Sequence, residues 1–287
     1  MDEEFRDPRL AAIYDALDSD RSDLDVYVAI LDELGAERVL DVGCGTGTFA
    51  LLLAQRGYDV VAVDPAVASI AVARSKPGAG RVCWVDGDAA AACVTDRDVT
   101  TMTANVVQHI VDPQHWQATL RAVCAALRPG GYLVFETRDP AARGWERWTR
   151  EATYRLTSVP GEGNVESWVE VTDFSWPLVS LGWTFVFASD GATLTSASTL
   201  RFRERDEVEA SSASSAAPWG CPDGPDTLSP DTGLGKDVPC ATFVEVSRRA
   251  VFAYLGYYNH DRLHSTLNYR TPHETRVSYH QHLAFAA

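Results

Sequence analysis

A short apolar run that passes directly into glycines constrains this chain most. Residues 39–47 read Val-Leu-Asp-Val-Gly-Cys-Gly-Thr-Gly, and a segment with helical spacing of apolar residues follows. A buried strand that turns through glycines into a helix lets backbone approach a ligand where a Cβ atom would clash. The block predicts a strand–turn–helix unit with a ligand-binding turn, although ordinary turns share the glycine spacing.

Apolar runs of strand length alternate with segments of helical period through the first half of the chain. We expect strands at 38–42, 59–63, 81–85, 99–104 and 132–136, and helices at 48–56, 67–74 and 114–127, after two short helices within 8–34. Strands that alternate with helices fold as a doubly wound, mostly parallel sheet. The sequence therefore predicts an α/β fold of the Rossmann-like kind.

The pattern changes period after residue 140. Aromatic and β-branched residues fill three runs, at 165–174, 178–188 and 192–203, and turn signals separate these runs. This indicates an antiparallel, three-stranded β insertion at about 165–203. Most of its large aromatic residues must pack the insertion onto the body, and we expect one or two at most to touch a substrate; they are Trp168, Trp176, Trp183, Phe185 and Phe187.

Three acids, Asp41, Asp64 and Asp88, lie at or near the ends of the first, second and third predicted strands. Asp41 precedes the glycines, where a phosphate-binding loop would avoid an acid, and Asp64 ends the second strand. An acid in the second position can accept two ribose hydroxyls. Asp88, after the third strand, can accept an exocyclic amine. Each acid taken alone could be a solvated strand end, so the order carries the argument.

With these residues in place, residues 8–210 resemble the class I S-adenosylmethionine-dependent methyltransferases. The resemblance implies a binding site for that cofactor: its methionine part on Asp41, Gly43, Cys44, Gly45, Thr46 and Gly47; its ribose on Asp64; its adenine beside Pro65, Ala66, Asp88 and Ala89. It also implies that Asn105 and Val106 run under the sulfonium and that Tyr14 closes the pocket. Tyr14 could equally be a helix-packing residue, and Cys44 a small filler rather than a reactive thiol.

Methyl transfer from a sulfonium is an in-line displacement, so alignment and exclusion of water are the main tasks. A general base helps only when the acceptor must lose a proton. His109, just after the fourth strand, is our candidate base, with a packing or capping role as the alternative. Weaker candidates near the same rim are His115, Arg138 and Asp139.

The end of the chain has a different character. Residues 211–239 are rich in Ser, Pro, Gly and Asp, which predicts a disordered linker, and residues 240–287 begin with an expected helix. About 240–280 is similar to the C-terminal end of insertion-sequence transposases with an integrase-like core. We expect a methyltransferase domain at 1–210 that lacks its last helix and two strands, fused to a transposase fragment without nuclease activity.

Composition and charge argue against several classes of function and of site. The net charge is −15, and because the stretch from Cys240 onward carries +2, the rest carries −17, which argues against nucleic-acid binding. Six scattered cysteines without a CxxC pair argue against a disulfide framework or a metal site. The acidic N-terminus and the absence of a long apolar run suggest a cytoplasmic protein without a membrane span.

These observations lead to one expected function and one alternative. We expect methyl transfer to a nitrogen or oxygen atom of a small molecule. The alternative is a truncated, catalytically dead methyltransferase remnant.

Overall fold

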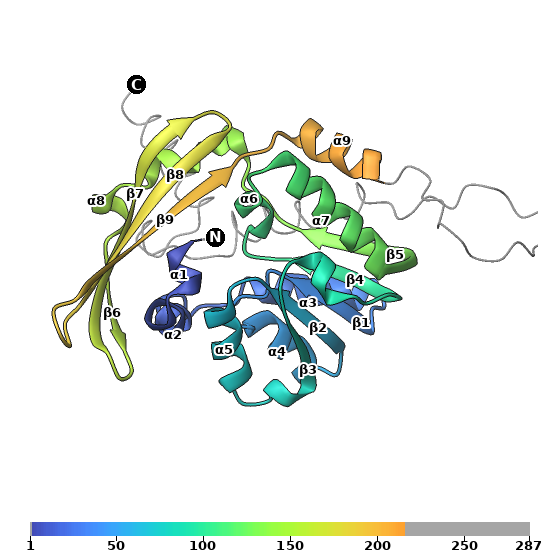
Figure 1. The fold of residues 1–287 in the computed structure, drawn as a ribbon, viewed down its shortest axis with the longest axis horizontal. Coiled ribbons are helices and arrows are strands. Elements are labelled where there is room, and N and C mark those ends of the chain that lie inside the picture. Colours follow the sequence, from blue (N-terminus) through green and yellow to red (C-terminus); the bar gives the residue numbers. More distant parts are fainter. Residues whose placement is uncertain (1, 216–287) are drawn as a thin grey trace, which may run out of the picture.

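Five parallel strands form the body of the protein, as a computed structural model of residues 2–215 shows (Figure 1). The strands are β1 (Arg38–Val42), β2 (Asp59–Asp64), β3 (Val82–Asp86), β4 (Arg97–Met102) and β5 (Leu127–Phe135). Their order is β3-β2-β1-β4-β5, so the chain winds outward in both directions from β1. The predicted doubly wound parallel sheet is confirmed, whereas the expectations for residues 216–287 lie outside the described residues.

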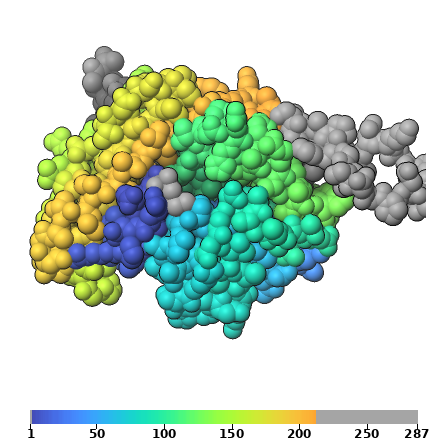
Figure 2. All heavy atoms as spheres, in the orientation of Figure 1, coloured from blue at the N-terminus to red at the C-terminus, as the bar shows by residue number. Residues whose placement is uncertain are grey.

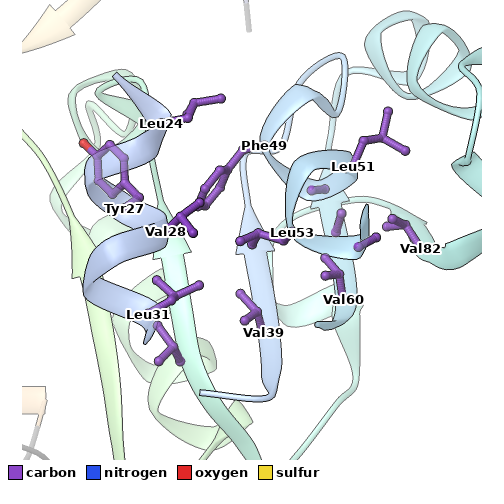
Figure 3. Packing of buried hydrophobic residues seen from close by; sticks show 14 of the residues in the cluster. Leu24, Tyr27, Val28, Leu31, Val39, Phe49, Leu51, Leu53, Val60 and Val82 are labelled. Atoms are coloured by element: carbon purple, nitrogen blue, oxygen red, sulfur yellow. The ribbon is translucent and has the colours of Figure 1, made fainter. Parts of the chain in front are cut away.

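Helices cover both faces of this sheet. They are α3 (Leu24–Glu33), α4 (Thr48–Gln55), α5 (Val67–Ser75), α6 (Val106–His109) and α7 (Pro113–Ala126), with the short turns η1 (Ala79–Arg81) and η2 (Ala89–Ala92). Figure 3 shows Leu31 of α3 and Leu53 of α4 packed against Val39 of β1. Each fully buried aliphatic side chain of this kind stabilises the fold by about 1.5–3 kcal/mol. The opposite face packs on α6, α7 and η2.

The second sheet is antiparallel and has four strands, so the prediction of three strands is wrong. They are β6 (Arg155–Val159), β7 (Gly163–Ser175), β8 (Leu178–Phe187) and β9 (Thr193–Arg201), in sequential order. The missed strand, β6, is a short edge strand in which only Val159 is buried. An edge strand with one buried residue leaves almost no alternation in the sequence. The turns η3 (Pro140–Ala142) and η4 (Gly144–Arg147) and helix α8 (Arg150–Thr153) precede it.

Two N-terminal helices lie between the sheets. They are α1 (Glu3–Arg6) and α2 (Pro8–Leu17), seen in blue in Figure 2 between the yellow antiparallel sheet and the cyan part of the body. Leu10 and Ile13 of α2 are buried against Phe185 and Phe187 of β8. Asp7 caps α2 by accepting hydrogen bonds from two backbone N–H groups. The sequence predicted α2 and α3, but α1 is only one turn long and was not expected.

The structure shifts several predicted boundaries, two of them substantially. β5 starts at Leu127 rather than 132, because residues 128–131 form an irregularity that the strand pairing skips. Helix α9 (Arg205–Ser215) packs near α7 and makes residues 211–215 helical, whereas the sequence predicted a linker from residue 211 onward. Within residues 2–215, β5 pairs only with β4. Across the same residues, no helix is long and apolar enough to cross a membrane.

Candidate functional site

The glycine loop joins the carboxyl end of β1 to α4. Gly43 and Gly47 both have positive φ angles, +73° and +78°, which suit glycine. A Cβ atom on Gly43 would lie 2.5 Å from a methyl of Val106, and one on Gly47 would lie 2.8 Å from the Ala73 Cβ and overlap the Trp84 ring. A Cβ on Gly45 would meet nothing within 4 Å. The outer two glycines are thus fixed by close packing, whereas the middle one leaves open space.

Asp41 is a buried acid beneath this loop. It is 1% exposed, its Oδ1 accepts a hydrogen bond from Thr101 Oγ1 at 2.8 Å, and its Oδ2 has no partner among the described residues. Burial raises the pKa of Asp41 to about 7, and the charge of Asp64 adds to this, although the Thr101 bond lowers the pKa. A buried oxygen without a hydrogen bond is costly, and a cationic or N–H-bearing ligand would satisfy it.

Asp64 is the last residue of β2 and forms a hydrogen bond with the glycine loop. Its Oδ2 accepts the N–H of Gly45 at 2.8 Å, and its Oδ1 accepts the N–H of Ala66 at 2.7 Å. Burial raises the pKa of Asp64, while these two backbone bonds lower it. Each carboxylate oxygen offers two lone pairs, so both oxygens can still accept a hydroxyl. The prediction that an acid ends the second strand is confirmed.

The ends of β2 and β3 adjoin each other, because the N–H of Gly87 donates to the carbonyl of Asp64 at 3.0 Å. Pro65 is exposed and Ala66 is buried, and Ala89 is also buried. Asp88 caps η2: its Oδ1 accepts the N–H groups of Ala90 and Ala91 at 3.1 and 3.3 Å. The structure therefore places all four predicted adenine residues at one edge, with one oxygen of Asp88 engaged in a cap.

The turn after β4 brings in Asn105, Val106 and His109. Asn105 has a left-handed backbone, with φ +60°, and its N–H donates to the Glu136 carboxylate at 3.2 Å. Val106 packs over Gly43. His109 ends α6, and its Nδ1 lies 3.0 Å from Oδ2 of Asp2. Its ring meets Phe5 edge-on at 5.7 Å.

Arg203 anchors α6, and the sequence did not reveal this role. The side chain is 2% exposed, and its guanidinium donates to the carbonyls of Val107 and Ile110 at 2.7 and 2.5 Å. It also lies over the ring of Trp116. Burial lowers the pKa of Arg203 to about 10, which still leaves it charged at neutral pH. The end of the antiparallel sheet thus fixes the short helix that carries His109.

The N-terminal helices α1 and α2 contact α6 and the glycine loop. Tyr14 is half-buried, with its ring 5.8 Å from that of Phe5, and burial raises its pKa to about 12. The next residue, Asp15, accepts hydrogen bonds from Thr46 and Thr48 at 2.6 and 3.1 Å.

Asp15 also pairs with Lys76 at 2.5 Å. The role of Asp15 was not predicted, because an acid beside the apolar stripe of a helix gives no signal of a distant partner. We call the contacts of Asp15 with Thr46, Thr48 and Lys76 the latch, since they hold α2 against the glycine loop.

Several other sequence candidates have structural roles. His115 is exposed in the first turn of α7, and Asp139 caps η3. Arg138 donates to the Gln108 side chain at 2.8 Å and so contacts α6. Burial raises the pKa of the Cys44 thiol well above its usual value, which favours the filler role over a reactive thiol.

The aromatic residues of the insertion mostly serve packing, as expected. Phe185 and Phe187 are buried against α2, and Trp168 is covered by the Arg150 guanidinium at 4.2 Å. Trp176 is 47% exposed. Trp183 is half-buried. It packs against two hydrophobic clusters of the antiparallel sheet, one around Phe185 and Phe187 and the other around Trp145 and Phe202. Trp183 therefore also serves packing, although it is not fully covered.

A separate surface depression of about 460 Å³ lies beside η4 and β7. Trp145, Trp148 and Phe174 line it, but no residue of the glycine loop, α1 or α6 does. Among the described residues, no cluster of three or more potential metal ligands occurs. The candidate site is thus the edge formed by the glycine loop, the ends of β2 and β3, and α6.

Comparison with known proteins gives one family match and several relatives. A family model described as a methyltransferase domain matches residues 5–180. An uncharacterized methyltransferase of Mycobacterium tuberculosis is 38% identical over 114 residues, which are 39% of this chain and 44% of that protein. A ubiquinone biosynthesis O-methyltransferase of Idiomarina loihiensis is 34% identical over 134 residues, 45% of this chain and 54% of that protein. The chain spans about half the length of these curated relatives.

Solved structures show the same fold. The S-adenosylmethionine-bound amino pentose methyltransferase CalS10 of Micromonospora echinaspora, involved in calicheamicin biosynthesis, matches with 25% identity and a TM-score of 0.56; the match covers 71% of this chain and 88% of that one. A methyltransferase from Clostridium acetobutylicum matches with 18% identity and a TM-score of 0.56, over 72% and 86%. At the latter identity, the likeness concerns the fold alone.

Proposed function

The chain belongs to the methyltransferase-domain family, and from that premise we propose that it transfers the methyl group of S-adenosylmethionine to a nitrogen or oxygen atom of a small molecule. One observation carries this proposal. Two buried acids, Asp41 and Asp64, end or nearly end neighbouring parallel strands and enclose the glycine loop, and one oxygen of Asp41 has no partner among the described residues.

The residues at this edge suit the parts of the cofactor. The free oxygen of Asp41 suits an ammonium group, the carboxylate of Asp64 suits a ribose diol, and open space faces Gly45. The remaining contacts that we propose are Gly43, Cys44, Thr46, Gly47, Pro65, Ala66, Asp88, Ala89, Asn105, Val106 and Tyr14. When bound, S-adenosylmethionine supplies a methyl group activated on a positively charged sulfur.

The chain itself supplies alignment and a dry environment. The latch from Asp15 to Lys76 and the loop threonines holds α2 over the glycine loop. Arg203 holds α6 against the end of the second sheet. Fixing two reactants in line can lower a reaction barrier by roughly 7–11 kcal/mol, and the Asp15 and Arg203 contacts would serve this alignment.

His109 is the proposed proton acceptor. Hydrogen bonds from His109 and Ser198 lower the pKa of Asp2 even though burial opposes this, so Asp2 is an ionised acceptor at neutral pH. Because a carboxylate can only accept, Nδ1 of His109 must carry the proton of that bond. In the neutral imidazole, Nε2 then carries a lone pair, which can take a proton from an acceptor nitrogen or oxygen.

A transfer assay tests this function. The full-length protein is incubated with methyl-labelled S-adenosylmethionine and a panel of small amines, phenols and carboxylic acids, and the label in product is counted. We expect turnover that His109→Gln reduces about 100-fold, while His115→Gln, at an exposed position, leaves it unchanged. A folded protein that neither binds S-adenosylhomocysteine nor transfers label would support the remnant alternative instead.

A further inference from the structure

Glu4 is a buried acid that the methyl-transfer site described above does not use. Its side chain is 8% exposed, and its backbone N–H donates to Ser196 Oγ of β9 at 2.9 Å. Within residues 2–215, no side chain or backbone group forms a hydrogen bond or ion pair with its carboxyl group. Buried carboxyl groups are normally paired, so a group of this kind needs an explanation.

The surroundings of Glu4 are electrostatically negative. Burial raises the pKa of Glu4 to about 8, and the nearby charge of Asp2 adds to this. Glu4 in turn helps to raise the pKa of Tyr14 on α2. An acid held in such a place lacks a counter-charge, and an incoming cation would supply one and favour its ionised form.

Glu4 also lies beside the proposed reacting groups. Two residues near Glu4 in the sequence contact His109 of α6: Asp2, which precedes α1, pairs with it at 3.0 Å, and the ring of Phe5, the residue after Glu4, meets its ring at 5.7 Å. Across β9, Ser196 is the cross-strand partner of Trp183, so the half-buried indole shares the sheet face that Glu4 contacts. The Glu4 carboxyl thus interacts electrostatically with Asp2, the partner of His109, while the Glu4 backbone contacts the sheet face that carries Trp183.

We propose that Glu4 is a substrate-binding residue and that the methyl acceptor is a basic amine, whose nitrogen it binds as a cation. This rests on the proposed function. A carboxylate holds an ammonium through a charge-assisted hydrogen bond, whereas a hydroxyl would leave the buried charge uncompensated. The site thus favours nitrogen over oxygen as the acceptor atom.

The transfer step balances with these groups. Nε2 of His109 takes one proton from the ammonium, which exposes the nitrogen lone pair. That pair forms the new N–C bond while the C–S bond breaks, and its electrons stay on sulfur. The methylated nitrogen then carries the positive charge, which the Glu4 carboxylate still faces.

Calorimetry with a matched pair of probes tests the proposal. Benzylammonium chloride and benzyl alcohol are titrated separately into full-length protein saturated with S-adenosylhomocysteine near neutral pH. We expect benzylammonium to bind more tightly than the alcohol, and Glu4→Gln to weaken its binding roughly 10- to 100-fold. Glu3→Gln makes the same charge change at an exposed position one residue away, and it should leave binding unchanged.

The outcomes separate the two claims. Equal binding of both probes, absent benzylammonium binding, or benzylammonium binding that Glu4→Gln does not weaken would overturn the amine proposal while S-adenosylhomocysteine still binds. Failure of S-adenosylhomocysteine itself to bind would instead contradict the proposed function. Glu4→Gln replaces a carboxyl that is neutral over most of the pH range below 8 by a neutral group of the same shape, so the variant should fold.

Discussion

The backbone N–H of Gly45 donates a 2.8 Å hydrogen bond to Oδ2 of Asp64, so the glycine loop of the first strand and the acid of the second form one unit. The same acid also accepts the N–H of Ala66. Its carboxylate is therefore fixed in orientation before any ligand arrives, which lowers the entropic cost of binding.

Gly47→Ala should destabilise the protein much more than Gly35→Ala. Both glycines have positive φ angles, so each substitution strains the backbone by about 1 kcal/mol. The new methyl at 47 would also meet the Trp84 ring and the Ala73 side chain, whereas at 35 it would meet nothing within 4 Å. We expect a further loss of about 2 kcal/mol in the free energy of unfolding for Gly47→Ala. Urea denaturation measures it, and equal losses would refute the packing argument.

Cys44 should resist alkylation while Cys83 and Cys93 react. The latter two thiols are exposed, but burial raises the pKa of Cys44 and suppresses its thiolate. Peptide mapping by mass spectrometry after a short treatment with iodoacetamide would resolve the three sites. Rapid labelling of Cys44 in the folded protein would restore the reactive-thiol reading.

Arg203→Met should loosen α6. The substitution keeps much of the side-chain volume but removes the charged donors to the carbonyls of Val107 and Ile110. We expect a loss of about 3 kcal/mol in the free energy of unfolding. Hydrogen exchange of residues 105–110 should become faster. Arg205→Met is the control, because Arg205 is exposed and pairs with Glu209 on the same helix; equal effects of both variants would contradict the anchoring role.

Glu4 should make the protein less stable as the pH rises. Its pKa is about 8 in the folded state and near 4.5 when unfolded, so between these values the folded state binds the extra proton. Stability gained from this group is complete below about pH 4.5 and is lost toward pH 8, by roughly 1.4 kcal/mol per pH unit. Other acids also titrate, so the measured quantity is the unfolding free energy of wild type minus that of Glu4→Gln. A difference that stays constant with pH would refute the buried-acid assignment.

Strongly periodic segments of the fold could be predicted from the sequence. β1, β2, α4 and α7 have long apolar patterns, because they are buried by many partners at once. α1 and β6 were missed since each has a single buried side chain, Glu4 and Val159, and one residue makes no period.

Local motifs of the candidate site could be predicted in the same way, but its long-range contacts could not. The glycine loop and Asp64 follow one another along neighbouring strands and leave a sequence signature. Asp15 accepts a hydrogen bond from Thr46, which lies 31 positions further along the chain. Arg203 donates to Ile110, which lies 93 positions before it. The capping of η2 by Asp88 could not be predicted either, because it depends on a turn geometry that residue spacing does not encode.

Titration of S-adenosylhomocysteine into the full-length protein by calorimetry tests the central claim most directly. Asp64→Asn is compared with Asp59→Asn, which makes the same change at the exposed opposite end of β2. We predict binding that Asp64→Asn weakens roughly 10- to 100-fold and Asp59→Asn does not. Absence of binding to folded wild-type protein, or equal binding by both variants, would contradict the cofactor site at the glycine loop.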